Sequence, residues 1–359
     1  MTILENRLSN LVESAIAQKV FSGASALVSR KNTLVFSRCW GTTFFGDKAK
    51  PVTPFTLFDL ASLTKPMATA TLVMTLAREG RLKSHDCLHR IFPSRRIPKD
   101  KKSLTIEQLL SHRSGLPAYK PYFRELVHVH PQHRKDTLME WVLCEPLITK
   151  PGTERLYSDL GYMLLGWILE ELTDSPLDVL FEDLVRPDQV SWNLGYRRLG
   201  AFPEMKGTHH GPSPSKHPKE MCVATEYCPW RGRLLQGEVH DENAYCLQGV
   251  SGHAGLFGTA RDVWEWSQKR ISLFQDKWRL AFDTPSSHGS SAGRYFSSNT
   301  VGHLGFTGTS FWMDLDQEIM VILLTNRVHP HRHDERIRVF RPLFHDTVME
   351  VMLHMKEPF

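Results

Sequence analysis

Apolar residues recur along the chain with two different periods, and the change of period divides the chain into parts. Near the N-terminus the β-prone runs Ala24–Arg30 and Thr33–Trp40 meet at a two-residue Lys-Asn turn, which predicts an antiparallel hairpin. Near the C-terminus His303–Asp314 and Glu318–Thr325 have the same character and predict a second hairpin. We therefore expect strands towards both ends of the chain.

Between these runs, and at both termini, the apolar residues recur at helical spacing. Residues 1–20 predict an amphipathic helix, and residues 331–355 predict another, in which Pro342 should kink the helix or mark its true start. Further helices are expected at 62–79, 105–112, 136–144, 159–173, 176–184 and 260–274. The irregular composition of 201–245 and the Ser/Gly-rich stretch 283–300 predict no regular elements.

This order of elements predicts a mixed fold, α+β or α/β. We expect an antiparallel sheet that is completed by both termini and flanked by the terminal helices, with a large all-helical lobe inserted. The expected division is a sheet-and-helix domain of residues 1–60 plus 255–359, and a helical domain of residues 61–254. The active site is expected in the cleft between the two domains.

Composition narrows the class of protein. The 359 residues are 41% hydrophobic and 23% charged with a net charge of +5, which is ordinary for a soluble globular protein. No run of Lys and Arg alternates with aromatic residues, and no apolar stretch is long enough to span a bilayer, so neither nucleic acid nor a membrane is an expected partner. We expect a cytosolic protein; the oligomeric state stays unknown. The six cysteines contain no CxxC pair and predict reduced thiols, or at most a local Cys222–Cys228 pair.

The segment Ser62-Leu63-Thr64-Lys65 places a hydroxyl and an amine three residues apart at the start of a predicted helix. Residues at this spacing share one helix face, so Lys65 can reach the Ser62 hydroxyl. A serine is a poor nucleophile until a neighbour takes its proton, and a lysine can do so only if its pKa is depressed. The pattern therefore predicts Ser62 as nucleophile and Lys65 as its base.

Two other serine motifs have weaker settings. Ser213-Pro214-Ser215-Lys216 repeats the spacing, but inside a Pro- and His-rich stretch with no helix to align the two side chains. Gly289-Ser290-Ser291-Ala292-Gly293 matches the G-x-S-x-G pattern, but it lacks the strand–turn–helix that exposes such a serine. Neither is expected to be the nucleophile.

Tyr157-Ser158-Asp159 lies just before the helix expected at 159–173. The Tyr157 phenol could shuttle a proton if nearby Lys65 lowers its pKa. The alternative is structural: a buried tyrosine with a satisfied hydroxyl, and Asp159 as an ordinary helix cap.

A glycine-rich stretch, Gly302–Ser310, opens an expected strand. Its glycines would let a substrate approach the backbone and be held as an added strand. The alternative is an edge strand that the glycines weaken without binding a ligand.

The Ser-x-x-Lys, Tyr-Ser-Asp and His-x-Gly segments, in this order, resemble the three motifs of the penicillin-recognising serine hydrolases. The order is most similar to the branch of class C β-lactamases, D,D-carboxypeptidases, D-aminopeptidases and β-lactamase-like esterases. Leu109–Leu116 and Gly249–Phe257 resemble two further phrases of this branch. The resemblance covers roughly residues 10–330. It implies a β-lactamase/transpeptidase-like fold and a serine hydrolase that acts on a small ester or amide through an acyl-enzyme.

The same resemblance implies roles for individual residues. Ser62 would be acylated, and Lys65 and Tyr157 would share the base and acid roles, with their order left open. The backbone N–H groups of Ser62 and of Phe306, just after His303-Leu304-Gly305, would hold the oxyanion. No metal or other cofactor is implied.

Two positions depart from the class C β-lactamase pattern. Asp159 stands where those enzymes usually have Asn, and His303 stands where they have Lys. An anion at 159 and the loss of a fixed cation at 303 should disfavour β-lactams, whose carboxylate would bind better only as the pH falls towards about 6.5. We expect a small-molecule esterase or peptidase; a D,D-carboxypeptidase or D-aminopeptidase and a weak β-lactamase are the alternatives.

Other polar groups carry weaker hypotheses. The histidine sets His128/His130/His133 and His329/His331/His333 could bind a metal, although adventitious binding is the simpler reading. The segment 240–243 and His253 could contact substrate, with an acidic pair that selects an amine, or could form an internal hydrogen-bonded loop. A catalytically idle ligand-binding relative is the non-enzyme alternative.

Overall fold

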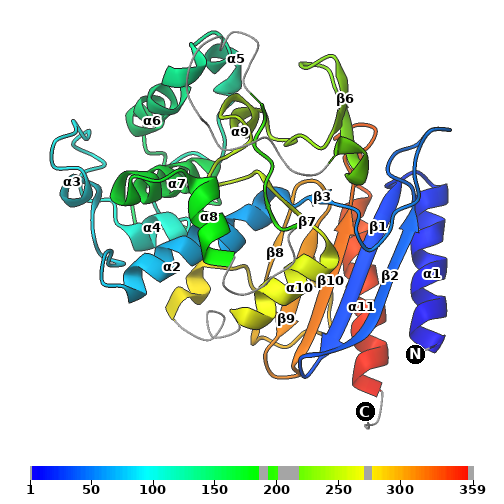
Figure 1. Ribbon diagram of the computed structural model, residues 1–359. Coiled ribbons are helices and arrows are strands. Elements are labelled where there is room, and N and C mark those ends of the chain that lie inside the picture. Colours follow the sequence, from blue (N-terminus) through cyan, green and yellow to red (C-terminus); the bar gives the residue numbers. More distant parts are fainter. Residues whose placement is uncertain (1, 186–192, 201–217, 271–276, 355–359) are drawn as a thin grey trace.

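The computed structural model describes residues 2–185, 193–200, 218–270 and 277–354. Its centre is a five-stranded antiparallel sheet with strand order β2-β1-β10-β9-β8 (Figure 1). The strands are β1 (Gly23–Arg30), β2 (Thr33–Gly41), β8 (Thr300–Leu304), β9 (Ser310–Asp314) and β10 (Ile319–Thr325). Both ends of the chain thus complete one sheet, and the expected fold class is confirmed.

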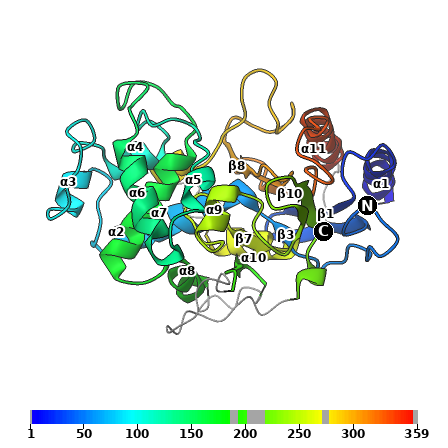
Figure 2. The same cartoon turned by 90° about the horizontal axis from the view of Figure 1, so that it is seen from above.

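The central strand β10 is buried on both faces. Ile319, Val321 and Leu323 pack into the core beneath the terminal helices, while the residues between them pack into the other core. The terminal helices α1 (Thr2–Ala17) and α11 (Ile337–His354) lie side by side on one face of the sheet (Figure 2). Helix α10 (Ala260–Lys269) packs against the opposite face.

The N-terminal hairpin forms as predicted. Its turn residues Lys31 and Asn32 both have positive φ, as a two-residue hairpin turn requires. The second predicted hairpin is wrong in one respect, because His303–Asp314 is not one strand. The chain turns at Gly305–Thr309, so that β8, β9 and β10 form a three-stranded meander.

The remaining helices lie between the first and last strands of the sequence. They are α2 (Thr71–Arg78), α3 (Leu88–Ile91), α4 (Ile106–Leu110), α5 (Phe123–Leu126), α6 (Arg134–Cys144), α7 (Asp159–Thr173), α8 (Leu177–Val185) and α9 (Glu242–Cys246). Most of them form a helical lobe beside the sheet (Figure 1). Helix α7 has the predicted bounds, and α4 is shorter than expected.

Three other predictions need correction. The stretch 201–245 is not wholly irregular: β5 (Ala224–Cys228) pairs with β6 (Arg233–Gln236), and α9 begins at Glu242. Pro342 does not mark the start of the last helix, because α11 begins at Ile337 and contains the proline. Helix α10 ends at Lys269, and the rest of its expected span from 271 to 274 lies outside the described residues.

A small three-stranded sheet connects distant segments. Its order is β3 (Phe58–Asp59), β7 (Leu256–Gly258) and β4 (Gly195–Tyr196), and Asp59 lies opposite Phe257. Strand β3 ends three residues before Ser62, and β7 begins three residues after His253. This pairing therefore brings the Ser62 segment and the His253 segment together.

Two further expectations concern the whole chain. Among the residues described, no helix is long and apolar enough to cross a membrane. All six cysteines are free thiols, so Cys222 and Cys228 do not form the local pair. The division into a sheet domain and a helical domain stays a prediction.

Asn326 joins three segments that lie far apart in the sequence. Its Oδ1 accepts the N–H groups of Ser22 and Gly23 at 3.1 Å each, and its Nδ2 donates to the Ser22 hydroxyl at 2.8 Å and to the Ala224 carbonyl at 2.9 Å. The side chain is fully buried, so it satisfies backbone groups that water cannot reach.

Replacing Asn326 with Leu should lower the free energy of unfolding by about 2–4 kcal/mol, because buried N–H groups without partners cost about 1–3 kcal/mol each. Urea unfolding followed by circular dichroism measures the loss. The control Asn10→Leu makes the same change at an exposed position of α1 and should alter stability little. Equal free energies of unfolding for the two variants would show that the hydrogen bonds of Asn326 do not stabilise the fold.

Candidate active site

The residue before Ser62 is held in a strained conformation. Ala61 has φ +48°, which costs a non-glycine residue free energy, and it opens the 3-10 turn Ala61–Leu63. Its N–H donates to Asp59 Oδ1 at 2.8 Å, while Asp59 Oδ2 accepts the N–H of His240 at 2.6 Å. Burial raises the pKa of Asp59. The buried Asp59 side chain therefore fixes the turn that presents Ser62.

Lys65 begins a wide helical turn instead of a regular α-helix. Residues Lys65–Ala70 are π-helical and lead into α2, so the helix predicted from residue 62 is regular only after Ala70. Such wide turns are rare and often occur at functional sites. Lys65 Nζ nevertheless reaches Ser62 Oγ at 2.9 Å, as the spacing of the two residues predicted.

Lys65 is fully buried, and oxygen atoms surround its ammonium. Besides Ser62 Oγ, they include the His253 carbonyl at 3.1 Å and Asp159 Oδ1, which forms an ion pair at 2.7 Å. Burial lowers the pKa of Lys65, but the Asp159 and Tyr157 side chains together raise it by more, so the pKa lies above its ordinary value. Lys65 is therefore an ammonium at neutral pH, with no lone pair to accept the Ser62 proton.

Tyr157 lies over the same ammonium. Lys65 Nζ is 5.0 Å from the centre of the Tyr157 ring, and the hydroxyl hydrogen-bonds with the side chains of Ser62 and Lys65. Tyr157 as a whole is 39% exposed, so the burial concerns its hydroxyl and not the ring. Burial around the hydroxyl raises the pKa of Tyr157, and the charge of Lys65 lowers it by less. Lys65 thus lowers the pKa of Tyr157, as the proton-shuttle hypothesis requires, but the net shift of this pKa is upward.

The resting site holds one proton more than acylation needs. With Lys65 as an ammonium and Tyr157 as a phenol, neither group can take the Ser62 proton. One of the two must first lose a proton, and because they are in contact that loss belongs to the pair. The geometry suits both orders of base and acid, so this alternative stays open.

The loop after β8 is docked on the segment before Ser62. The hydroxyls of Thr307 and Thr309 donate to the carbonyls of Asp59 at 2.7 Å and Leu60 at 3.1 Å. A Cβ on Gly305 would lie 2.7 Å from the Leu60 carbonyl oxygen, so only glycine allows this approach.

Phe306, the next residue, exposes about half of its surface. Its carbonyl accepts Arg327 Nε at 2.7 Å. Within the described part of the chain its N–H has no hydrogen-bond partner. That N–H can therefore serve a ligand.

His303 is buried beside Tyr157, with 6.0 Å between the ring centres. Its Nδ1 lies 2.9 Å from the Leu304 carbonyl, which can only accept, so Nδ1 carries the hydrogen. Burial lowers the pKa of His303. The ring is thus neutral at pH 7, Nε2 is an acceptor, and protonation needs a pH below the value of about 6.5 that the sequence led us to expect.

Sequence reasoning missed the support beneath Tyr157. The His112 ring lies 4.5 Å from the Tyr157 ring, and its Nδ1 accepts the Ser158 N–H at 3.0 Å. Burial holds the pKa of His112 well below its usual range, so the ring is neutral. In the sequence, His112 stands out only as part of the family-like phrase Leu109–Leu116. Its contact with a loop 45 residues away leaves no periodic pattern in the sequence.

The structure gives no support to the two alternative serine motifs. Ser213 and Lys216 lie outside the described residues. The stretch Gly289–Gly293 is a loop without the strand–turn–helix of a nucleophile elbow, and the Ser291 carbonyl accepts from His345.

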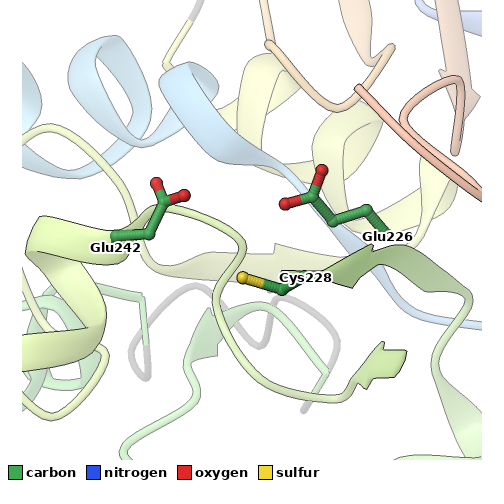
Figure 3. Close-up of side chains that lie close together, drawn as sticks. All are labelled: Glu226, Cys228 and Glu242. Atoms are coloured by element: carbon green, nitrogen blue, oxygen red, sulfur yellow. The ribbon is translucent and has the colours of Figure 1, made fainter. Parts of the chain in front are cut away.

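The two histidine sets do not form a metal-type cluster among the residues that the structure describes; the group found there is Glu226, Cys228 and Glu242. Figure 3 shows these side chains converging from β5 and from the start of α9. Arg332 hydrogen-bonds with both carboxylates, at 2.9 Å to Glu226 and 2.5 Å to Glu242. Its guanidinium already supplies the cation at this cluster, and we propose no metal there.

Comparisons with known proteins agree with this geometry. A family model described as β-lactamase matches residues 8–343. The chain is 33% identical to an N-acetylmuramyl-L-alanine amidase of Bacillus subtilis, over 76% of this chain and 68% of that protein. It is 30% identical to an Escherichia coli K12 protein provisionally named a D-alanyl-D-alanine carboxypeptidase, over 89% of this chain and 82% of that protein.

Solved structures of other proteins share the fold. The hydrolase EstCE1, described as having promiscuous acyltransferase activity, aligns with TM-score 0.65 and 19% identity over 95% of this chain and 99% of its own. The octameric penicillin-binding protein homologue from Pyrococcus abyssi aligns with TM-score 0.65 and 17% identity over 97% of this chain and 77% of its own.

Replacing Asp159 with Asn should move the acidic limb of the pH–rate profile to lower pH by about one unit or more, because a neighbouring opposite charge shifts a pKa by about that much. The sign follows from the ion pair: Asp159 favours charged Lys65, so its removal lets the pair lose its proton at lower pH. Hydrolysis of p-nitrophenyl acetate from about pH 6 to about pH 10 measures the limb. An unmoved limb would mean that Asp159 does not set the charge of Lys65.

Proposed function

The chain belongs to the β-lactamase family and is a serine hydrolase, and from this membership we propose that Ser62, Lys65 and Tyr157 are its catalytic residues. The observation that supports the proposal is the contact of all three side chains around one buried ammonium. An idle ligand-binding protein would have no need of this arrangement, so the arrangement speaks against the non-enzyme alternative.

In the proposed reaction, Ser62 Oγ attacks a carbonyl carbon of the substrate. Its proton passes to whichever of Lys65 and Tyr157 has lost one, and the same pair then protonates the leaving group. The N–H groups of Ser62 and Phe306 hold the oxyanion, since donors aimed at developing charge stabilise the transition state. Water deacylates the enzyme by the reverse proton transfers.

The charges at the site favour a substrate without a carboxylate beside the reacting carbonyl. Asp159 carries a negative charge, and neutral His303 presents only an acceptor nitrogen. A carboxylate placed there would meet repulsion and no donor from either side chain. We therefore propose a short ester or an uncharged amide as substrate.

A second candidate is an amidase or carboxypeptidase acting on peptides that contain D-amino acids. It is favoured by the names of the relatives at 33% and 30% identity. The cytosolic location expected from the sequence favours the first candidate, the short ester or uncharged amide, because an enzyme that acts on the cell wall works outside the cytoplasm. Cell fractionation with an antibody to the protein distinguishes the two locations.

A fluorophosphonate should label Ser62 and no other serine. Peptide mass spectrometry after labelling is expected to find one adduct on the peptide that contains Ser62, and Ser62→Ala should abolish both the adduct and ester hydrolysis. Ser291→Ala is the matched control and should label like the wild type. An adduct on Ser291 or Ser213 would refute the assignment.

Combining Asp159→Asn with His303→Lys should raise the ratio of kcat/KM for a cephalosporin to that for a short ester by about tenfold, or about 1.4 kcal/mol in relative barrier. The double variant removes the repelling anion and supplies a cation. Parallel assays with nitrocefin and p-nitrophenyl acetate give the ratio. A wild type that hydrolyses nitrocefin faster than every ester tested would reverse this view of specificity.

A further inference from the structure

The third acceptor of Lys65 is a backbone carbonyl, and its position depends on residues far from Ser62 in the sequence. The carbonyl belongs to His253, 3.1 Å from Lys65 Nζ. It faces a fully buried ammonium, so a displacement would take a hydrogen-bond acceptor away from a charge that water cannot reach.

The His253 side chain is clamped at both ring nitrogens. Nε2 lies 2.9 Å from Asp241 Oδ1, and Nδ1 lies 2.8 Å from the Ser251 hydroxyl. A carboxylate can only accept, so Nε2 carries a hydrogen. His253 and Ser251 are buried, and the pair His253–Asp241 therefore fixes the peptide that carries the carbonyl.

The same loop contacts the Ser62 helix on both sides of Lys65. The Thr69 hydroxyl donates to the Gly252 carbonyl at 2.6 Å, and the Leu256 N–H donates to the Thr64 hydroxyl at 3.1 Å. A Cβ on Gly252 would lie 2.1 Å from the Tyr162 carbonyl oxygen, so the loop has no room to shift towards α7.

Helix α9 links this clamp to the other acceptor of Lys65. Asp241 caps α9 by accepting the Ala244 N–H at 2.7 Å with the oxygen that also faces His253. Asn243 donates to the Lys120 carbonyl at 2.9 Å and accepts the Phe123 N–H at 2.8 Å. Two residues before Lys120, the Ala118 carbonyl accepts the Asp159 N–H at 2.9 Å.

We propose that Asp241 and His253 are positioning residues of the active site, which hold the His253 carbonyl on Lys65 and so keep Lys65 aligned with Ser62. This inference rests on the proposed function, because it assigns a task to the lysine beside the proposed nucleophile. Neither residue is proposed to touch the substrate. Their effect passes through the geometry of Lys65.

Two substitutions of Asp241 separate its capping of α9 from its contact with His253. Asp241→Ser keeps a helix cap but is too short to reach His253, whereas Asp241→Asn keeps both the cap and an acceptor for the ring. The rate of Ser62 labelling by a fluorophosphonate, measured at saturating probe across pH, reports on the nucleophile without a known substrate. Half-saturating probe concentration and thermal stability are measured on the same samples.

Asp241→Ser should lower the limiting labelling rate about tenfold or more, with half-saturation changed less than about twofold, because misplacing a catalytic group by about 1 Å can cost about 100-fold. The acidic limb should also move to lower pH by about one unit, since the ammonium loses an acceptor. Asp241→Asn should restore the rate to within about threefold of the wild type. Asp241→Ser removes the partner of His253, and the remaining titratable side chains around Lys65 stay in place: Asp159, Tyr157, Tyr162, His112 and His303.

His345→Asn is the matched control for the loss of a buried side-chain contact. His345 is a buried residue of α11, and its Nδ1 hydrogen-bonds to the Ser291 carbonyl, away from Lys65, so this variant should lose stability and keep its labelling rate and pH limb. The inference is overturned if Asp241→Ser is labelled at the wild-type rate. It is also overturned if the labelling rate falls in proportion to the loss of thermal stability in all three variants, Asp241→Ser, Asp241→Asn and His345→Asn. Labelling that survives in Ser62→Ala would instead refute the proposed function.

Discussion

The ion pair between Lys65 and Asp159 is the contact on which the rest of the site depends. A lysine ammonium with no exposed surface costs several kcal/mol to remove from water, and that cost is offset only by a full set of acceptors in good geometry. The chain supplies them from three distant segments: the Ser62 hydroxyl, the Asp159 carboxylate and the His253 carbonyl. The ammonium is therefore stable only when these segments are in place, so folding of the helical lobe and assembly of the site are coupled.

Short connections with fixed geometry hold the acceptors of Lys65 in place. The pairing of β3 with β7 sets the Ser62 and His253 segments side by side, and Asp59 holds Ala61 in its strained conformation just before the nucleophile. The loop after β8 docks on the same segment through Thr307. Strain at Ala61 persists because the neighbours on both sides of the turn determine its position.

Much of the fold could be predicted from periodicity, because the long buried strands and amphipathic helices leave strong patterns. The break between β8 and β9 could not, since it depends on Gly305 approaching the Leu60 carbonyl. Motif spacing predicted the contact of Ser62, Lys65 and Tyr157, but the net direction of the Tyr157 pKa depends on the surroundings of its hydroxyl, which no motif records. The contribution of His253 was hidden for another reason: a backbone carbonyl is present at every position, so only the structure shows which one faces the lysine.

The central claim is that Asp159 keeps Lys65 charged, and an NMR titration tests it most directly. In protein labelled with ¹³C-lysine, the Cε signal that is absent in Lys65→Arg belongs to Lys65. We predict that this signal stays that of an ammonium beyond the ordinary lysine pKa of about 10.4. A Lys65 that titrates between about pH 6 and about pH 8, as a lysine with a depressed pKa would, contradicts the claim and makes Lys65 a ready base in the resting enzyme.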